Sequence, residues 1–456
     1  MVFQKKTMLA IALLIAGINP VFSQHLPSIF NEPSSQKLSR MKWWTDARFG
    51  VFIHWGLYSL GARHEWLKHN EHMTNEEYQR YFEEFNPDHF EPKKWAAAAK
   101  AAGMKYAVLT TKHHDGFCLF DSKYTSYKAV NTPAKRDLVK EYVDAFRAQG
   151  MKIGFYYSLL DWHHPDYTMD NVHPLVQTDT SAANYERLNK GRDMAKYREY
   201  MKNQITELLT KYGKIDILWL DWTWGKGDKR GKHAEDWGAV ELIKLVKKLQ
   251  PGIIVNNRLG LEDYADGGDF VTPEQVSSKE LEKFKGQTWE TCQTFSGSWG
   301  YYRDETSWKT HRQLLDLLIT SVANGGNLIL NVGPTAHGEF DYRANSALDS
   351  LSYWMHANDK AIYNCTFAPE SFVQPEGTRL TYNPSTRRLY IHLYNFEPDS
   401  TLTLPGYAGK LQYAQLLNDE SEILYSATGN DIVLKMPKVR PPYEIPVIEL
   451  ILKTTK

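Results

Sequence analysis

Hydrophobic and polar residues follow two different patterns along this 456-residue chain. Between about residues 40 and 335, short runs rich in β-branched and aromatic residues alternate with longer segments of helical periodicity. This alternation is typical of parallel strands joined by crossover helices. The eight predicted strands are 49–54, 106–111, 152–157, 216–221, 252–256, 269–272, 289–293 and 327–332. The main predicted helices are 92–102, 137–149, 192–212, 234–249 and 308–323. Eight such strands favour a (β/α)8-like barrel, in the α/β class.

After residue 363 the pattern changes to short strands of alternating polarity, at 388–394, 401–404, 431–434 and 447–452. Turn-forming pairs such as Asn383-Pro384 and Pro405-Gly406 separate them. This pattern predicts a C-terminal antiparallel β-sandwich. The chain is therefore divided into a barrel over residues 24–362 and a sandwich over residues 363–456.

The first 23 residues have the pattern of a signal peptide. Lys5 and Lys6 precede an apolar run at 8–17, and small residues come before Gln24. A membrane anchor is the alternative, but the run is shorter than the ~20 residues that span a bilayer. We therefore expect an exported protein, periplasmic or secreted, with no membrane span in the mature chain.

Composition narrows the class of ligand. Lys plus Arg and Asp plus Glu both total 54, so nothing in the net charge favours nucleic acid or an anionic membrane as partner. Aromatic residues make up 13% of the chain, which suits a sugar-binding site as well as a large core. The three widely spaced cysteines predict buried thiols and no disulfide framework. The balanced charge and the aromatic content therefore favour a neutral ligand. No sequence pattern indicates an oligomeric state.

Titratable and polar residues stand at or just past the ends of the predicted strands. Because the active site of such a barrel forms where the carboxyl ends of its strands meet, we expect these side chains to converge there. They are His54, His113, His114, Tyr157, Asp221, Arg258, Glu274, Glu290 and Asn331.

Asp221 is the leading candidate for a catalytic carboxylate, because it ends a buried run that begins at Ile215. A structural helix cap or salt bridge is the alternative. Retaining glycoside hydrolysis needs a second carboxyl group that serves as acid and then as base. Glu274 and Glu290 are both candidates, and spacing alone does not choose between them.

We do not interpret the three histidines, His54, His113 and His114, as metal ligands. No third and fourth ligand stands near them at a regular metal-binding spacing. Neutral imidazoles instead suit hydrogen bonds with sugar hydroxyls. The sequence therefore predicts neither a catalytic metal nor a cofactor.

Seven short motifs together resemble the α-L-fucosidases of glycoside hydrolase family 29, in the order found in that family and over about residues 35–365. They are His54-Trp55-Gly56, Glu65-Trp66, Lys112-His113-His114-Asp115-Gly116-Phe117, Tyr156-Tyr157-Ser158, Trp219-Leu220-Asp221, Asn256-Asn257-Arg258 and Ser298-Trp299-Gly300-Tyr301.

The resemblance implies a retaining hydrolase of terminal α-L-fucose, with fucosylated oligosaccharides or glycoconjugates as substrates. It implies that Asp221 is the nucleophile, and the segment 269–274 favours Glu274 as acid/base, with Glu290 in reserve. That segment also suggests a preference for α-1,3/1,4-linked fucose. Trp299 matches a position near the C5 methyl group. The remaining implied sugar contacts are His54, Glu65, Trp66, His113, His114, Tyr157, Trp219 and Arg258.

Two other functions are compatible with the same residues. One is a retaining glycosidase for another sugar, such as galactose. The axial hydroxyl pattern of galactose is related to that of fucose by mirror symmetry. The other is a sugar-binding barrel without catalysis, although Asp221 is present.

Overall fold

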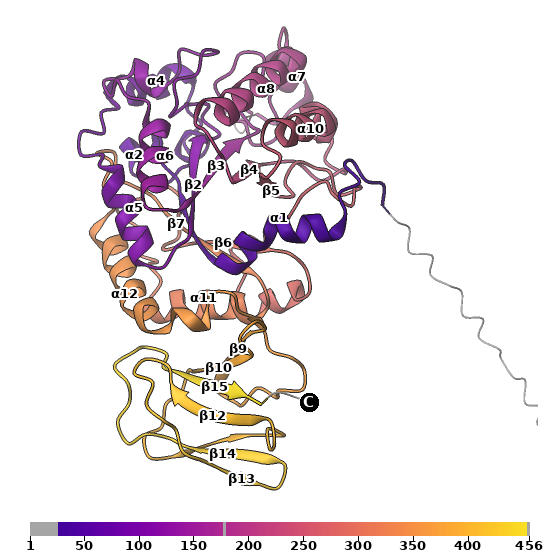
Figure 1. Ribbon diagram of the computed structural model, residues 1–456. Helices are drawn as coiled ribbons and strands as arrows, with labels where there is room; N and C mark the ends of the chain where they lie inside the picture. Colours follow the sequence, from indigo (N-terminus) through magenta and orange to yellow (C-terminus); the bar gives the residue numbers. More distant parts are fainter. Residues whose placement is uncertain (1–25, 177–178, 454–456) are drawn as a thin grey trace, which may run out of the picture.

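The protein is described by a computed structural model over residues 26–176 and 179–453 (Figure 1). The predicted signal peptide, residues 1–23, lies outside the described residues. No helix in the described part of the chain is both long and apolar enough to cross a membrane.

The parallel strands form a curled seven-stranded sheet in the order β5-β4-β3-β2-β1-β7-β6. Its members are β1 (Phe49–Ile53), β2 (Tyr106–Lys112), β3 (Lys152–Ser158), β4 (Ile217–Asp221), β5 (Ile254–Val255), β6 (Glu290–Thr294) and β7 (Asn327–Val332). The first and last residues of these strands differ from the predicted ones by at most about two positions. The predicted (β/α)8-like barrel with a C-terminal β-sandwich is confirmed.

The eighth predicted strand, 269–272, takes a different form. It joins the two edges of the sheet through isolated bridges, from Phe270 to Asn256 and from Val271 to Trp289. Pro273 has no N–H to donate, so the ladder toward β6 is interrupted there, although the carbonyl of Pro273 still accepts the N–H of Cys292 at 3.2 Å. The barrel is closed by this segment, and Glu274 lies at its end.

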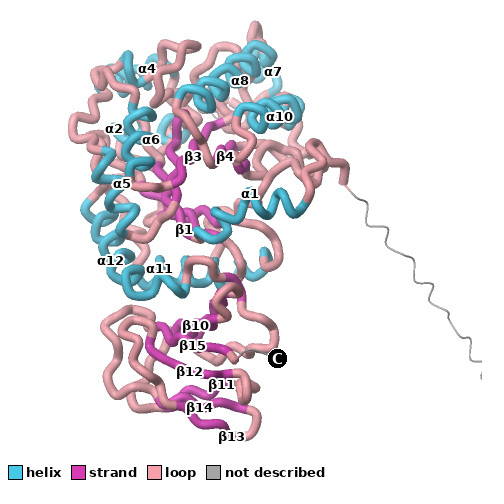
Figure 2. Tube along the Cα trace, in the orientation of Figure 1, coloured by secondary structure: helices cyan, strands magenta, loops and turns pink. Residues whose placement is uncertain are grey.

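Helices surround the strands, as Figure 2 shows in cyan around magenta. The predicted helix 234–249 is interrupted at Gly238, which has a left-handed φ of 58°. The predicted helix 308–323 begins at His311 because the side chain of Thr310 caps it, accepting from the N–H of Gln313. The α-helices are α1 (Ser34–Ala47), α2 (Tyr58–Gly61), α3 (Leu67–Asn70), α4 (Asn75–Glu84), α5 (Pro92–Ala101), α6 (Leu138–Ala148), α7 (Ala182–Asn189), α8 (Met194–Lys211), α9 (Ala234–Trp237), α10 (Ala239–Leu249), α11 (His311–Ala323) and α12 (Tyr342–Asn358). Within residues 26–176 and 179–453, short 3₁₀ helices lie at Ala129–Asn131, Glu280–Phe284 and Asp359–Ala361.

The sheet separates two apolar layers. The larger one packs the outer face of the strands against the helices. The smaller one fills the barrel interior and includes Phe52, Tyr156 and Trp219. Because successive strand residues point to opposite faces, this alternation decides which side chains reach the barrel mouth.

The C-terminal part folds as a sandwich of a five-stranded and a three-stranded antiparallel sheet. Its strands are β8 (Thr366–Phe367), β9 (Thr378–Asn383), β10 (Arg388–Leu393), β11 (Thr401–Leu404), β12 (Leu411–Leu416), β13 (Tyr425–Thr428), β14 (Asp431–Lys435) and β15 (Val447–Leu452). Figure 1 shows the sandwich in yellow below α11. The Tyr394 hydroxyl donates to Asp316 at 2.6 Å, and the Trp354 indole donates to the carbonyl of Ile445 at 2.9 Å, so hydrogen bonds tie α11 and α12 to it.

Candidate active site

Asp221 is held at the carboxyl end of β4 by two hydrogen-bond donors. The Tyr156 hydroxyl donates to Oδ2 at 2.8 Å, and Nη1 of Arg258 donates to Oδ1 at 2.9 Å. Burial and the charge of Asp221 raise the pKa of Tyr156, so its hydroxyl remains protonated and keeps donating. The carboxylate is therefore oriented from both sides, while its residue is 8% exposed.

Arg258 links the two candidate catalytic carboxylates. Its Nη2 donates to Oε2 of Glu274 at 2.6 Å, and Nε donates to Oγ1 of Thr272 at 2.9 Å. The guanidinium also lies 4.6 Å from the centre of the Trp219 ring, a cation-π contact. Burial alone would lower the pKa of Arg258, but Asp221 and Glu274 raise it above its usual value. A permanent positive charge thus stands beside both carboxylates.

The three histidines of the site are buried and neutral. Burial lowers the pKa of His54 and of His114 to about 3, and burial together with His114 lowers that of His113. The rings of His113 and His114 lie 4.2 Å apart, and those of His54 and His113 lie 5.6 Å apart. They therefore form one group at the barrel mouth, without a net charge.

Hydrogen-bond partners fix the tautomers of two of these rings. Nδ1 of His54 lies 2.6 Å from the side-chain oxygen of Asn331, which only accepts. Nδ1 of His114 lies 2.6 Å from the Ser158 hydroxyl, which itself donates to the carbonyl of Leu160. Both Nδ1 atoms must therefore carry the proton, which leaves each Nε2 as an acceptor for a ligand hydroxyl. Nε2 of His114 lies 3.9 Å from Oδ2 of Asp221.

Aromatic side chains lie on both sides of the histidines. Trp299 is positioned by Glu65, whose Oε2 accepts the N–H groups of Trp299 at 3.1 Å and Gly300 at 2.8 Å. The amide of Asn331 donates to the carbonyl of Trp299 at 2.6 Å. The Trp299 ring centre lies 5.1 Å from that of His54. Asn331 thus fixes both the histidine and the tryptophan.

On the other side, the ring of Trp66 lies 5.4 Å from His114 and 5.3 Å from Trp222. Trp222 directly follows Asp221 and has a left-handed φ of 79°, a conformation that costs free energy for a residue with a bulky side chain. The turn that aims Asp221 into the barrel mouth is therefore strained. Sequence reasoning did not single out Trp222.

The structure corrects the expectation for Tyr157. This side chain points outward from the barrel, where its hydroxyl donates to Oε1 of Gln204 on α8 at 2.7 Å. The register pairs Tyr156 with Trp219 and Ser158 with Asp221, so those residues face inward. Tyr156 is thus the tyrosine of the site. Asp221 was expected to face inward. Applying the same orientation to the paired residues of the neighbouring strand β3 would have identified Tyr156 as the inward-facing tyrosine.

The expectation that Glu290 lies at the barrel mouth is also wrong. Glu290 begins β6 and pairs with Asn327, the first residue of β7, whereas Asp221 ends β4. It is fully buried at the opposite end of the barrel, and its Oε2 accepts the hydroxyl of Tyr106. Burial raises its pKa to about 7. Of the two candidate partners, the structure brings only Glu274 to Asp221.

Taken together, the barrel mouth contains an oriented carboxylate, an exposed carboxyl group, a bridging cation, neutral acceptors and aromatic rings. The described residues with metal-binding potential, Asp88, His89 and His337, lie elsewhere. The site can therefore attack an electrophilic carbon, move a proton at a departing oxygen, and bind a neutral hydroxyl-rich ligand.

Comparisons with known proteins relate this arrangement to one family. A model of the family described as alpha-L-fucosidase matches residues 23–360. The structure of alpha-L-fucosidase isoenzyme 1 from Paenibacillus thiaminolyticus is 42% identical, has a TM-score of 0.83, and covers 92% of this chain and 100% of that chain. A Bacteroides thetaiotaomicron alpha-L-fucosidase, solved as a trapped covalent intermediate with 2-fluoro-fucosyl fluoride, is 30% identical with a TM-score of 0.78, covering 91% and 96%. An alpha-L-fucosidase of Dictyostelium discoideum is 27% identical over 95% of this chain and 96% of its own length.

Proposed function

This chain belongs to the α-L-fucosidases of glycoside hydrolase family 29, and from that premise we propose that it releases terminal α-L-fucose by double displacement, with Asp221 as nucleophile and Glu274 as acid/base. The observation that carries the proposal is the pair of donors on Asp221. A nucleophile whose two oxygens are held by Tyr156 and Arg258 is already oriented before the sugar arrives.

In the first step, an oxygen of Asp221 bonds to the anomeric carbon of fucose as the bond to the leaving oxygen breaks. Glu274 gives its proton to that oxygen. In the second step, Glu274 takes a proton from water, the water oxygen bonds to the anomeric carbon, and the ester to Asp221 breaks. The configuration at the anomeric carbon is retained because it is inverted twice. The covalent intermediate trapped in the Bacteroides thetaiotaomicron relative supports this route.

Glu274 has the position and the exposure that this role requires. Its side chain is 40% exposed, so an incoming glycosidic oxygen can reach it. In the free enzyme it is paired with Arg258, and we propose that the bound sugar replaces this contact. Its carboxyl group is then free to hold the proton that the leaving oxygen needs.

The lining of the site suits fucose as the bound sugar. The Nε2 atoms of His54 and His114 accept hydrogen bonds from ring hydroxyls, and Glu65 orients Trp299 beside them as an apolar surface. A deoxy sugar with several hydroxyls and one methyl group matches neutral acceptors beside an aromatic wall. We propose that the segment 269–274 adapts the site to branched glycans with α-1,3/1,4-linked fucose. Comparing release from α-1,2- and α-1,3/1,4-fucosylated oligosaccharides tests this preference.

We also propose that the protein is exported and acts in the periplasm or outside the cell. The cationic and apolar pattern of residues 5–17 supports this location. Mass spectrometry of the mature N-terminus in a bacterial host, with cleavage expected before Gln24, tests it.

The test of the function combines a substrate panel with an Asp221→Gly variant. Nitrophenyl α-L-fucoside should be hydrolysed by the native protein, whereas nitrophenyl α- and β-galactosides should not. Asp221→Gly should lower turnover by several orders of magnitude, and azide should partly restore it with β-fucosyl azide as product, because the small anion fills the space of the nucleophile.

An Asp263→Gly variant serves as control, because Asp263 pairs with Lys226 on the surface. It should keep native turnover and show no azide effect. Turnover of a galactoside in preference to the fucoside would reassign the sugar, and no turnover of any member of the panel would indicate a binding protein. Native-like activity of Asp221→Gly would remove Asp221 from the role of nucleophile.

A further inference from the structure

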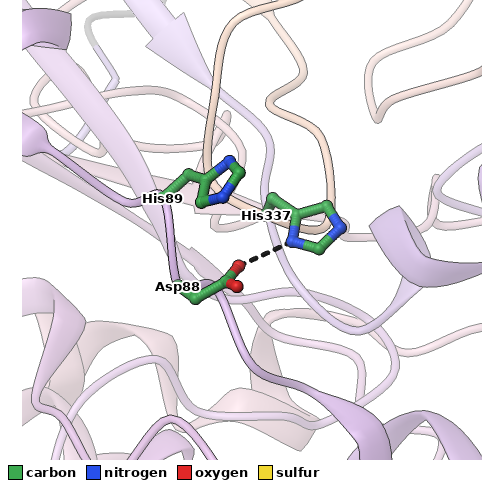
Figure 3. A group of neighbouring side chains, drawn as sticks. All are labelled: Asp88, His89 and His337. Atoms are coloured by element: carbon green, nitrogen blue, oxygen red, sulfur yellow. Dashed lines mark hydrogen bonds and ion pairs between the residues drawn. The ribbon is translucent and has the colours of Figure 1, made fainter.

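Two histidines and two carboxylates meet on the barrel surface, outside the catalytic site. Asp88 and His89 precede α5, and His337 and Glu339 lie between β7 and α12. Nδ1 of His337 lies 2.6 Å from Oδ1 of Asp88, and Nδ1 of His89 lies 3.1 Å from Oε2 of Glu339. The potential ligand atoms of Asp88, His89 and His337 all lie within 4.8 Å of one another. Figure 3 shows both imidazole rings above the Asp88 carboxylate.

We propose that Asp88, His89 and His337 form a zinc-binding site, with Glu339 as an additional ligand. Zinc prefers imidazole nitrogen and carboxylate oxygen in a four-coordinate arrangement, and this group offers two of each. Calcium and magnesium prefer oxygen ligands alone, so the two histidines select against them. All four side chains are at least half exposed, which lets a hydrated ion reach them.

The backbone around these side chains is already fixed. The N–H of His89 donates to the carbonyl of His337 at 3.0 Å, which joins the two loops directly. The indole of Trp95 donates to the carbonyl of Gly338 at 3.0 Å. Gly338 has a left-handed φ of 88°, and a Cβ there would lie 2.9 Å from the backbone of Phe90. Ordering these loops therefore adds little to the free-energy cost of binding an ion.

Ordinary ion pairs explain only part of this geometry. Each of the two contacts, Asp88 with His337 and Glu339 with His89, joins one histidine to one carboxylate. They do not explain why the two imidazole rings lie 5.1 Å apart, at an angle of 31°. One divalent ion can be shared by both rings.

A bound ion would cross-link segments about 250 residues apart in the chain, since Asp88 and His337 are separated by 249 positions. An ion that binds only the folded state, where these two segments meet, raises the stability of that state by mass action. Zinc should therefore stabilise the loop between β7 and α12 without entering the reaction.

The test uses the full-length mature protein without an affinity tag, after treatment with a chelator and its removal. Titration with zinc chloride in a calorimeter should show one ion bound per chain, and the unfolding temperature should rise with zinc concentration. Cobalt(II) as a spectroscopic probe should give the visible absorption of a tetrahedral site. Hydrogen exchange should slow in peptides covering residues 85–91 and 333–341 when zinc is added.

His337→Ala and Asp88→Ala should each weaken zinc binding at least about tenfold, by loss of one ligand. His356→Ala, an exposed histidine on α12, is the matched control and should bind zinc like the native protein. Circular dichroism and retained fucosidase activity establish that the variants are folded. Absence of stoichiometric binding, or equal binding by native protein and His337→Ala, would show ion pairs only and overturn the proposal.

Discussion

At the residue scale, the site depends on which face of a strand each side chain occupies. Tyr156 and Tyr157 are adjacent, yet one hydroxyl contacts Asp221 and the other contacts Gln204 behind the sheet. The first hydroxyl belongs to the candidate site, and the second belongs to the packing between the sheet and α8. One strand therefore presents a residue of the candidate site on its inner face and a purely structural residue on its outer face.

Tyr156→Phe should lower kcat/KM for nitrophenyl fucoside about ten- to hundredfold, because a hydrogen bond to a charged group is worth about 1.5–3 kcal/mol. Its free energy of unfolding should fall too, because Asp221 loses this donor in the free protein as well. Tyr157→Phe should keep native kcat/KM and lose about 1–3 kcal/mol in stability, since Gln204 loses its donor. Steady-state kinetics and urea unfolding of both variants measure this, and a loss of activity confined to Tyr157→Phe would contradict it.

Glu274→Ala should lose about 10²–10⁴-fold activity on fucosylated oligosaccharides but far less on nitrophenyl fucoside. The reason is that a sugar alcohol needs protonation to depart, whereas nitrophenolate leaves as a stable anion. The alkaline limb of its pH profile should flatten. Azide should give α-fucosyl azide with this variant, because azide replaces water in the second displacement.

The control for this variant is Glu262→Ala, which removes an exposed carboxylate from the neighbouring loop. It should hydrolyse both substrates like the native protein. Equal losses by Glu274→Ala on the two substrates would remove Glu274 from the role of acid/base.

Glu290 should make the stability of the fold depend on pH. Burial raises its pKa from 4.5 in the unfolded chain to about 7 in the fold, so the folded protein keeps a proton that the unfolded chain releases. The stabilisation of the fold by this retained proton is fully present below about pH 4.5 and is lost as the pH rises through about 7. The loss amounts to about 3 kcal/mol.

Glu290→Gln keeps the shape and an acceptor for Tyr106 but cannot ionise. Its free energy of unfolding should therefore fall less than that of the native protein between about pH 4.5 and 7.5, as measured by urea unfolding. Glu84→Gln, at an exposed position, should follow the native pH dependence. Parallel curves for the native protein and Glu290→Gln would refute the buried titration.

At the element scale, the segment from Asp269 to Glu274 performs two tasks. It closes the barrel between β5 and β6, and it delivers Glu274 to the mouth. Its start is anchored by Asp269, which pairs with Arg40 of α1 and Lys247 of α10, each at 2.7 Å. Burial would raise the pKa of Asp269, but Lys247 and Arg40 outweigh it and lower the pKa.

Asp269→Ala should therefore lower the free energy of unfolding by about 3–5 kcal/mol, because it leaves the largely buried Lys247 without its carboxylate and Arg40 with Glu32 alone. Asp263→Ala removes one partner of an ion pair whose side chains are 67% and 71% exposed, and should cost less than about 1 kcal/mol. Urea unfolding of the two variants makes the comparison. Equal effects would show that Asp269 is not the anchor of the segment.

Much of the element order could be predicted from the sequence, because buried strands and helices leave strong periodicities. The division of the predicted helix 234–249 at Gly238, and the irregular form of the eighth strand, depend on single backbone conformations that periodicity does not encode. The placements of Tyr157 and Glu290 were wrong for a related reason. A polar residue near a strand indicates neither the face nor the end that it occupies until the register of the neighbouring strands is known.

At the scale of the whole molecule, the parts have separate tasks. Every described residue of the candidate site comes from the barrel, and the sandwich packs against the barrel through α11 and α12. The proposed zinc site lies on the barrel surface, and its residues differ from those of the catalytic site. Stability and catalysis should therefore respond differently to removal of metal.

Extensive treatment with a chelator should leave kcat and KM for nitrophenyl fucoside unchanged while lowering the unfolding temperature. The site histidines are neutral, and the Nδ1 atoms of His54 and His114 already have partners. Assays before and after treatment, with zinc added back, measure both properties. Activity that disappears with chelator and returns with zinc or manganese would place a metal in the catalytic site.

The way the barrel closes also determines which parts of this enzyme can change over evolution. Asp221, the proposed nucleophile, is delivered by a regular strand, where a shift of one residue would turn its side chain out of the interior. Glu274 is delivered by a segment held through isolated bridges, whose length and path can vary with little damage to the core. The proposed nucleophile is thus fixed by the fold itself, while the proposed proton donor can be relocated. Divergence among descendants of this enzyme should accordingly concern the glycan that departs more than the sugar that is bound.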